Sequence, residues 1–215
     1  MGPALAGYRH LIWDWNGTLL DDLDLCVEVM NSLLAPRSLP LLDRARYRAA
    51  FDFPVRDYYA RLGFDFRRES FEAVGAEFIA TYERRRGECA LHDGALSLLA
   101  AVQAGGATQS ILSAYHRGAL REFVGHFGLA PFFLRLNGPE DIYAHGKLEL
   151  GRNWIRELGL PPAEVLMIGD TLHDAETARA MGVACVLVAA GHHAPERLRG
   201  AGVPVYSSLA ALAAG

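Results

Sequence analysis

Residues 8–18 have the sequence Tyr8-Arg9-His10-Leu11-Ile12-Trp13-Asp14-Trp15-Asn16-Gly17-Thr18, an apolar run followed directly by a polar, glycine-containing turn. The apolar part, residues 8–13, has the β-branched and aromatic content of a buried strand. Asp14 follows it at once, where backbone amides of the turn can bind an anion. A helix cap is the other role open to Asp14 alone, so its role depends on the rest of the chain.

The alternation of strand and helix continues along most of the sequence. Further strands are expected at residues 108–112, 133–136, 165–168, 184–188 and, at a sheet edge, 203–206. Between them, residues 95–104, 118–127, 148–158 and 174–181 have helical patterns, each followed closely by glycine. Residues 207–215 are expected to form a last packed helix. The predicted fold class is α/β, a doubly wound parallel sheet with a Rossmann-like core.

Residues 22–88 interrupt this alternation. They contain no convincing strand and are expected to form successive amphipathic helices, divided by Pro36, Pro40, Pro54 and Gly63. The domain prediction is therefore an α/β core at 1–21 and 89–215 with an all-helical insertion at 22–88. The insertion is rich in arginine, which we interpret first as a solvated surface.

The composition narrows the class of protein. The chain has 215 residues, of which 51% are hydrophobic and 21% charged, so it can bury a core and is not a disordered chain or a fibrous rod. Its net charge of -4 gives no basic surface for a nucleic acid polymer. Cys26, Cys89 and Cys185 lie far apart and are expected to be reduced thiols. Neither a signal peptide nor a membrane span is expected, so we predict a cytoplasmic protein.

Polar residues at or after four strands are candidates for a common site, since ligands of an open parallel sheet bind beyond the carboxyl ends of its strands. They are Asp14, Ser113, Asp170 with Asp174, and Lys147. The three carboxylates suit Mg²⁺, the serine hydroxyl can donate to a phosphate oxygen, and the lysine supplies positive charge. Lys147 is the only lysine in the chain, and arginine cannot replace a compact ammonium.

On these residues the sequence resembles the haloacid dehalogenase-like superfamily of aspartate-nucleophile hydrolases. The resemblance covers nearly the whole chain, with residues 14–18, Ser113, Lys147 and residues 169–174 in the order of the family's four motifs. The insertion at 22–88 is similar to the family's small helical cap. By layout, the phosphoglycolate phosphatase-like and β-phosphoglucomutase-like branch is the nearest subgroup.

The resemblance implies a role for each site residue. Asp14 would be the nucleophile that forms an aspartyl-phosphate. Mg²⁺ would be bound by Asp14, the backbone carbonyl of Asn16 and Asp170, with Asp174 holding a metal-bound water or Lys147. The residues expected to bind phosphate and substrate are Asn16, Gly17, Ser113, Ala114, Lys147 and, from the cap, Arg56.

The sequence departs from the family at Asn16, where the phosphatases usually have a second aspartate that acts as general acid and base. An amide cannot donate and recover a proton, and general acid–base catalysis contributes about 10² to 10⁴ in rate. Sugar phosphates are therefore expected to be poor substrates, and acyl or activated aryl phosphates better ones. His116, His173, His192 and His193 are possible replacements, although a surface or supporting role is the simpler interpretation for each.

The same residues also distinguish between the other activities known in this superfamily. Phosphonate cleavage requires a cap lysine, and the cap has none. Dehalogenases of this superfamily do not keep the acidic metal-binding motif, which Asp170 and Asp174 preserve here. A mutase must protonate and deprotonate sugar hydroxyls, so it is the alternative that the absence of an aspartate at position 16 disfavours most. We predict a Mg²⁺-dependent phosphatase of a small phosphorylated metabolite, monomeric or homodimeric. The alternative is a low-turnover protein that binds a phosphate ligand and has a regulatory role.

Overall fold

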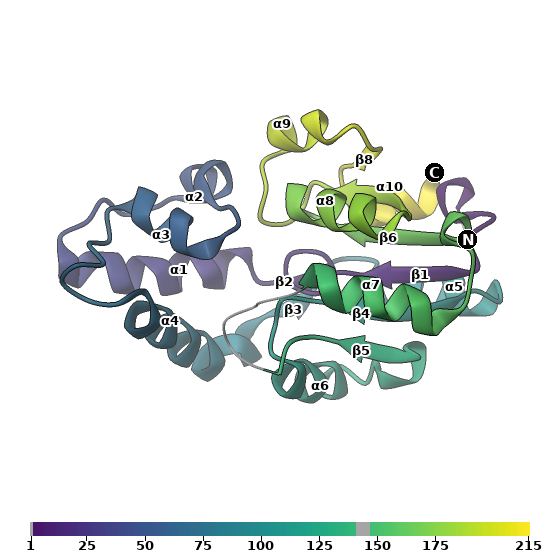
Figure 1. Ribbon diagram of the computed structural model, residues 1–215, viewed down its shortest axis with the longest axis horizontal. Coiled ribbons are helices and arrows are strands. Elements are labelled where there is room, and N and C mark those ends of the chain that lie inside the picture. The colour runs from purple at the N-terminus through teal and green to yellow at the C-terminus, as the bar shows by residue number, and fades with distance from the viewer. Residues whose placement is uncertain (1, 141–146) are drawn as a thin grey trace.

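The computed structural model describes residues 2–140 and 147–215 of the chain. It has two lobes, an α/β lobe and a helical lobe, joined at one end of the sheet (Figure 1). The sheet has six strands in the order β5-β4-β1-β6-β7-β8, and every neighbouring pair is parallel. The strands are β1 (His10–Trp13), β4 (Thr108–Leu112), β5 (Arg135–Asn137), β6 (Val165–Gly169), β7 (Ala184–Val188) and β8 (Val205–Tyr206). The predicted α/β fold class is confirmed.

Helices cover both faces of the sheet. They are α5 (Ala95–Ala104), α6 (Arg117–His126), α7 (Lys147–Leu158), α8 (Leu172–Met181), α9 (Pro195–Leu198) and α10 (Leu209–Ala214). Side chains alternate across a strand, so Leu11 and Trp13 of β1 pack with α5, α6 and α10, whereas Ile12 packs with α7, α8 and α9. Because β1 is buried on both faces, its sequence is continuously apolar.

The helical lobe, defined as α1–α4, lies beyond the carboxyl ends of the strands (Figure 1). Its helices are α1 (Leu23–Leu34), α2 (Arg44–Ala50), α3 (Val55–Leu62) and α4 (Phe71–Arg85). They enclose a separate apolar cluster that includes Met30, Leu34, Tyr59 and Val74. Gly63 ends α3 with φ +102°, a conformation that side chains other than glycine rarely adopt. The domain boundaries at 22 and 88 stay a prediction.

A short antiparallel pair, β2 (Leu20–Asp21) with β3 (Ala90–Leu91), connects the two lobes and was missed by sequence reasoning. Two residues are too few to show a periodicity. Short 3-10 turns complete the fold at Pro3–Leu5, Ala35–Arg37, Arg86–Glu88, Ala130–Phe132, Pro162–Glu164 and Arg199–Ala201.

Many arginines of the helical lobe form ion pairs with acids on its outer surface. Arg37 pairs with Glu69 and Glu77, and Arg85 pairs with Glu28 and Glu88. Such partly exposed pairs contribute little to stability, about 0–1 kcal/mol each, as expected of a solvated surface. Within the described ranges, no helix is both long enough and apolar enough to span a membrane.

Candidate functional site

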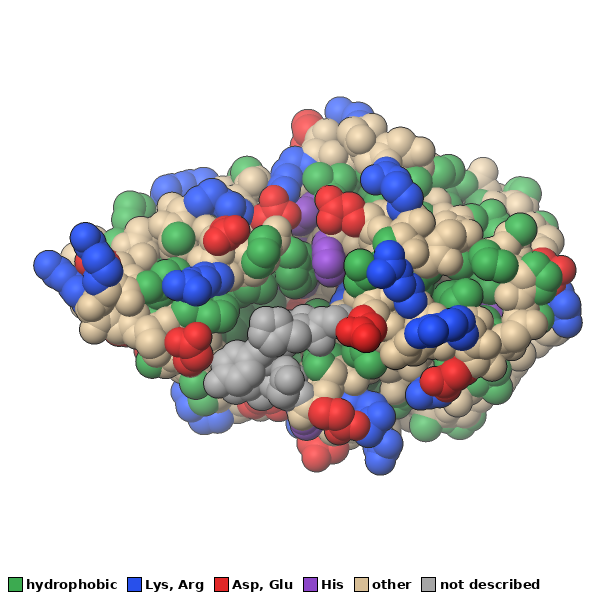
Figure 2. Space-filling view, in the orientation of Figure 1, with side chains coloured by type: hydrophobic (Ala, Val, Ile, Leu, Met, Phe, Trp, Pro, Cys, Tyr) green, Lys and Arg blue, Asp and Glu red, His purple; other side chains and the backbone are tan. Residues whose placement is uncertain are grey.

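The strand β1 lies at the centre of the sheet, with β4 and β5 on one side of it and β6, β7 and β8 on the other. The connections along the chain change direction at this point. Ligands of such sheets bind at the carboxyl ends beside this point. A cavity of about 260 Å³ lies there, lined on the core side by Asp14, Asn16, Ser113, Ala114 and Lys147 and on the other side by the helical lobe. Figure 2 shows a hollow between the lobes, with hydrophobic side chains beside it. The motifs from four parts of the chain therefore meet at one cavity.

Lys147 joins two of the predicted carboxylates. It begins α7, is 5% exposed, and its Nζ donates to Asp14 Oδ1 at 2.7 Å and to Asp174 Oδ1 at 2.6 Å. Burial alone would lower the pKa of Lys147, but the two carboxylates raise it above its ordinary value. The lysine is therefore an ammonium ion, held where a compact charge is required.

Asp170 follows Gly169 at the end of β6, and its two carboxylate oxygens have separate donors. The Thr18 hydroxyl donates to Oδ1 at 2.8 Å, and the His192 backbone N–H donates to Oδ2 at 2.6 Å. Gly17 has φ +74°, and a Cβ at this position would lie 2.4 Å from Asp170 Oδ2. The turn after β1 therefore requires glycine for the carboxylate to lie against it.

Asp174 has a structural role in addition to its contact with Lys147. Its Oδ2 accepts hydrogen bonds from the Thr171 backbone N–H at 3.0 Å and from the Thr171 hydroxyl at 2.7 Å. These contacts form a capping box at the start of α8. Both oxygens thus have protein partners, and Asp174 fixes Lys147 in the direction of Asp14.

The acidic group suits a divalent cation. Oxygens of Asp14, Asp170 and Asp174 lie within 4.8 Å of one another, and all three residues are buried. Burial raises the pKa of Asp14 to about 8 and that of Asp170 to about 6. Burial would also raise the pKa of Asp174, but the Lys147 ammonium holds it below its ordinary value. When all three carboxylates are ionised, one ammonium leaves uncompensated negative charge that a cation would balance, and hard oxygen donors are those that Mg²⁺ prefers.

Asn16 lines the cavity, and its side-chain amide donates to two neighbouring groups. Its Nδ2 donates to Asp22 Oδ2 at 2.7 Å and to the Tyr82 hydroxyl oxygen at 2.9 Å. The Tyr82 hydroxyl in turn donates to Asp22 Oδ2 at 2.8 Å. Because an ionised carboxylate only accepts, Asp22 determines which end of the amide faces it. The Nδ2 group of Asn16 thus has two acceptors, Asp22 and Tyr82.

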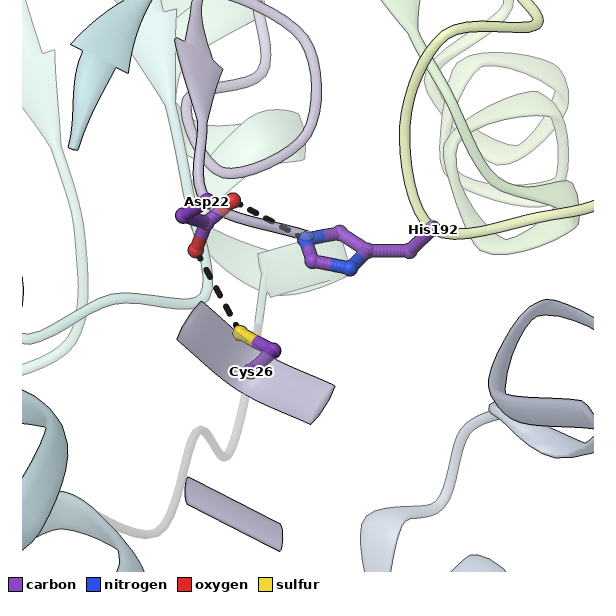
Figure 3. A group of neighbouring side chains, drawn as sticks. All are labelled: Asp22, Cys26 and His192. Carbon is purple, nitrogen blue, oxygen red and sulfur yellow. Dashed lines mark hydrogen bonds and ion pairs between the residues drawn. The ribbon is translucent and has the colours of Figure 1, made fainter. Parts of the chain in front are cut away.

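Sequence reasoning missed Asp22, which is the centre of a buried group with Cys26 and His192 (Figure 3). Asp22 Oδ1 lies 3.2 Å from His192 Nε2, and the Cys26 thiol donates to Asp22 Oδ2 at 3.5 Å. Burial opposes charge on both partners, yet their attraction lowers the pKa of Asp22 and raises that of His192 to about 9. This ion pair links the start of the helical lobe to the loop after β7.

The expectation that Arg56 faces the substrate does not agree with the structure. Arg56 is exposed on α3, its guanidinium lies 5.7 Å from the centre of the Phe66 ring, and it does not line the cavity. It shares the exposed side of the helix with Ala60, whereas the buried Tyr58 lies about half a turn away. The tyrosine, not the arginine, reaches the cavity.

The four histidines contact other groups of the protein, and their supporting roles stay a prediction. His116 caps α6, where its Nδ1 accepts from the Ala119 N–H at 3.4 Å and its Nε2 lies 3.0 Å from the Glu140 carbonyl. His192 Nδ1 lies 3.2 Å from the Tyr47 hydroxyl. His173 stacks on Phe53, with ring centres 4.6 Å apart, and His193 Nδ1 accepts from the Leu172 N–H at 3.1 Å. Only His116 and His192 line the cavity, and both ring nitrogens of each are engaged.

Curated proteins similar in sequence to this chain are named as phosphatases or as a nucleotidase. A 5'-nucleotidase of Pseudomonas aeruginosa is 31% identical over 206 residues, covering 93% of this chain and 90% of the relative. An N-acetylmuramic acid 6-phosphate phosphatase of Pseudomonas putida is 28% identical over 195 residues, covering 87% and 86%. A phosphoglycolate phosphatase of Synechococcus elongatus is 26% identical over 187 residues, covering 85% and 84%.

Solved structures show the same fold at low sequence identity. A haloacid dehalogenase-like family hydrolase from Streptococcus pneumoniae aligns with a TM-score of 0.79 at 16% identity, over 93% of both chains. CbbY from Rhodobacter sphaeroides, solved in complex with phosphate, aligns with a TM-score of 0.71 at 19% identity, over 95% of this chain and 96% of that one. The model of the family described as "Haloacid dehalogenase-like hydrolase" matches residues 11–188. The predicted resemblance is therefore confirmed: the chain belongs to the haloacid dehalogenase-like hydrolase family.

Proposed function

We propose that this haloacid dehalogenase-like phosphatase uses Mg²⁺ and hydrolyses a small phosphorylated metabolite through an aspartyl-phosphate on Asp14. The observation that carries the proposal is the position of Asp14. It follows the central strand β1, lines the cavity, and has one carboxylate oxygen fixed by Lys147 at 2.7 Å. Among the described residues the other oxygen, Oδ2, has no hydrogen-bond partner, so it is free to attack phosphorus.

The other residues of the site have roles that follow from their contacts. Asp14, Asp170 and the backbone carbonyl of Asn16 would hold Mg²⁺, which when bound supplies positive charge to the transferring phosphoryl group. Lys147 neutralises charge on the same group, and Asp174 orients it. Ser113, buried at the end of β4, lines the cavity with Ala114 and would bind a phosphoryl oxygen. Positioning and charge neutralisation are what phosphoryl transfer requires.

The expected substrates follow from Asn16. Its amide cannot protonate a leaving oxygen, and its Nδ2 group already donates to Asp22 and Tyr82. Phosphates whose leaving group needs no proton, namely acyl and activated aryl phosphates, should therefore be hydrolysed faster than sugar phosphates. The same amide cannot take a proton from the attacking water, so hydrolysis of the aspartyl-phosphate should be slow.

The test is phosphate release from acetyl phosphate with and without Mg²⁺. Asp14→Asn should abolish turnover, and Asp170→Asn should raise the Mg²⁺ concentration needed for half-maximal activity. Asp57→Asn is a matched control, since Asp57 is exposed on α3 and does not line the cavity. Full activity of Asp14→Asn, or an unchanged Mg²⁺ requirement in Asp170→Asn, would contradict the assignment.

A second function, binding of a phosphate ligand with little turnover, is favoured by one observation, the absence of a proton donor at Asn16. It predicts that phosphate binds in the presence of Mg²⁺ while acetyl phosphate is not hydrolysed by the wild type. A cytoplasmic location and a monomeric or homodimeric state stay predictions from the sequence.

A further inference from the structure

The part of the cavity that faces away from Asp14 is apolar and largely aromatic. Among the side chains that the helical lobe contributes to it are Phe51, Phe53, Tyr58, Phe71, Phe78 and Ile79. The aromatic rings lie against one another, with Phe51 and Phe53 at a centre-to-centre distance of 5.5 Å and Phe51 and Tyr58 at 5.3 Å. Aromatic walls favour an aromatic or apolar ligand group. The organic part of the substrate would lie against this wall.

The same region lacks a cation that could receive an anionic substituent. Among the described residues, no arginine lines the cavity, and its one lysine, Lys147, is already paired with two carboxylates. His192 lines it but is paired with Asp22. Two further acids belong to the lining on the side of α4: Glu72, which is exposed, and Glu83, which is paired with Arg86. A carboxylate or second phosphate on the substrate would therefore find no unpaired cation in the described lining and would face the carboxylate of Glu72, which is unfavourable.

The reacting end of the cavity restricts the leaving group independently. The Asn16 amide is not an acid and already donates to Asp22 and Tyr82, and the two histidines that line the cavity, His116 and His192, have both ring nitrogens engaged. Among the described residues, neither Asn16 nor these histidines is a free proton donor, which favours a leaving oxygen that departs as an anion. A phenolate does so far more easily than an alkoxide, since phenols have a pKa near ~10, as in the tyrosine side chain, and aliphatic alcohols resemble water, at about 15.7.

We propose that the substrate is an aryl phosphate, the phosphate monoester of an uncharged phenol, whose ring lies against Phe51, Phe53 and Phe78. The inference rests on the proposed function and names its substrate class. A cavity of about 260 Å³ is slightly smaller than the range of roughly 300–1,000 Å³ that is usual for ligand pockets, which suits a small ring.

The reaction balances without an added reagent. A carboxylate oxygen of Asp14 forms a bond to phosphorus while the bond from phosphorus to the phenolic oxygen breaks, and the phenolate leaves with the electron pair. The phenolate is released or takes a proton from solvent. Water then attacks phosphorus, the bond to Asp14 breaks and restores its carboxylate, and the proton of the water goes to solvent.

Three matched pairs of compounds test the inference on the wild-type protein with Mg²⁺. Phenyl and benzyl phosphate share a ring but differ in leaving group, and kcat/KM should be about 10² to 10⁴ higher for phenyl phosphate. The 4-carbamoylphenyl and 4-carboxyphenyl phosphates have similar shape but differ in charge, and the uncharged one should be favoured at least about tenfold. 4-Nitrophenyl phosphate should have a lower KM than acetyl phosphate, which has no ring.

Variants connect the preference to the aromatic wall. Phe78→Ala should lower the ratio of kcat/KM for 4-nitrophenyl phosphate to that for acetyl phosphate by roughly tenfold, as expected for an apolar contact in a pocket. Phe66→Ala is the control, because Phe66 is also half-buried in the helical lobe but does not line the cavity. If Phe78→Ala does not fold, Phe78→Leu should change the same ratio in the same direction.

The outcomes separate this inference from the proposed function. Hydrolysis of acetyl phosphate supports the phosphatase, and absence of hydrolysis for every compound would overturn both proposals. Hydrolysis of acetyl phosphate together with equal rates for the charged and uncharged rings, or a preference for phosphoglycolate or a nucleoside monophosphate, would overturn the aryl phosphate alone. An unchanged ratio in the folded Phe78 variant would also overturn it.

Discussion

Replacing the amide of Asn16 with a carboxyl group restores the acid that the site lacks, and Asp22 determines its protonation. In Asn16→Asp the new oxygen lies near the position of Nδ2, 2.7 Å from Asp22 Oδ2. Two ionised carboxylates at this distance repel by about 6 kcal/mol at an effective dielectric of ~20. This repulsion corresponds to roughly four pKa units. The pair therefore retains one proton near neutral pH, and a protonated carboxyl is the form that a general acid requires.

The activity gained by Asn16→Asp should be larger for substrates whose leaving group needs a proton more. For benzyl phosphate or a sugar phosphate, kcat/KM should rise by about 10² to 10⁴, the usual contribution of general acid catalysis. The gain should be small for 4-nitrophenyl phosphate and absent for acetyl phosphate, because their leaving groups need little or no protonation. The assay is initial-rate phosphate release under identical Mg²⁺ and pH for the wild type and Asn16→Asp.

A stability measurement provides the control. Asn16→Asp loses the amide's hydrogen bond to Tyr82 and holds a proton that the unfolded chain releases near neutral pH, so its free energy of unfolding in urea should fall by a few kcal/mol, about 1 kcal/mol of it for the lost hydrogen bond. The exchange Asn16→Asp with Asp22→Asn restores an amide–carboxylate pair in reverse and should recover part of the loss. Equal gains for alkyl and acetyl phosphates, or no gain for either, would refute the assignment of position 16 to the leaving group.

Three further outcomes are expected. Mg²⁺ at 100 times its dissociation constant should raise the free energy of unfolding by about 2.7 kcal/mol, and Asp170→Asn should reduce this shift; an equal shift in both proteins would contradict the metal site. Tyr82→Phe should lower stability by about 1–3 kcal/mol because its hydroxyl bonds Asn16 and Asp22. Tyr58→Phe should not lower stability, since among the described residues that buried hydroxyl has no partner; thermal unfolding of both variants compares them. Burial lowers the pKa of His10 from 6.5 to about 4, so the unfolded chain binds a proton that the folded chain does not, and stability falls as pH drops through this window. Urea unfolding of the wild type should show a loss of about 2 kcal/mol from this residue between pH 7 and 5, and His10→Gln should lack that part of the dependence.

The sequence predicts the sheet and the carboxylates of the candidate site because their signals are local. Each strand is a short apolar run, and Asp14 and Asp170 directly follow two of them at the same edge. Lys147 stands out as the sole lysine, although its contact with Asp174 requires the fold. The predictions agree best with the structure where a strand and the residue directly after it are enough to make them.

Features that depend on distant partners could not be predicted. Asp22 has the local appearance of a helix cap, and its partners Tyr82 and His192 lie 60 and 170 positions further along the chain. Arg56 was misplaced because the phase of the eight-residue helix α3 is not fixed by so short an apolar pattern. The pair of β2 and β3 forms only because the two lobes bring the chain back to the same place.

The surroundings of Asn16 argue against a simple loss of the catalytic acid. Asp22 is ionised, buried and paired with His192, and this pair joins the helical lobe to the core. Its Oδ2 needs donors, and Asn16 and Tyr82 supply them. A carboxylate at position 16 would remove one donor and add repulsion, so the amide and the ion pair form one stabilised unit. On the proposed mechanism, Asn16 provides a fixed contact between the lobes in place of proton transfer, and leaving groups that need no proton are the ones that this arrangement would permit.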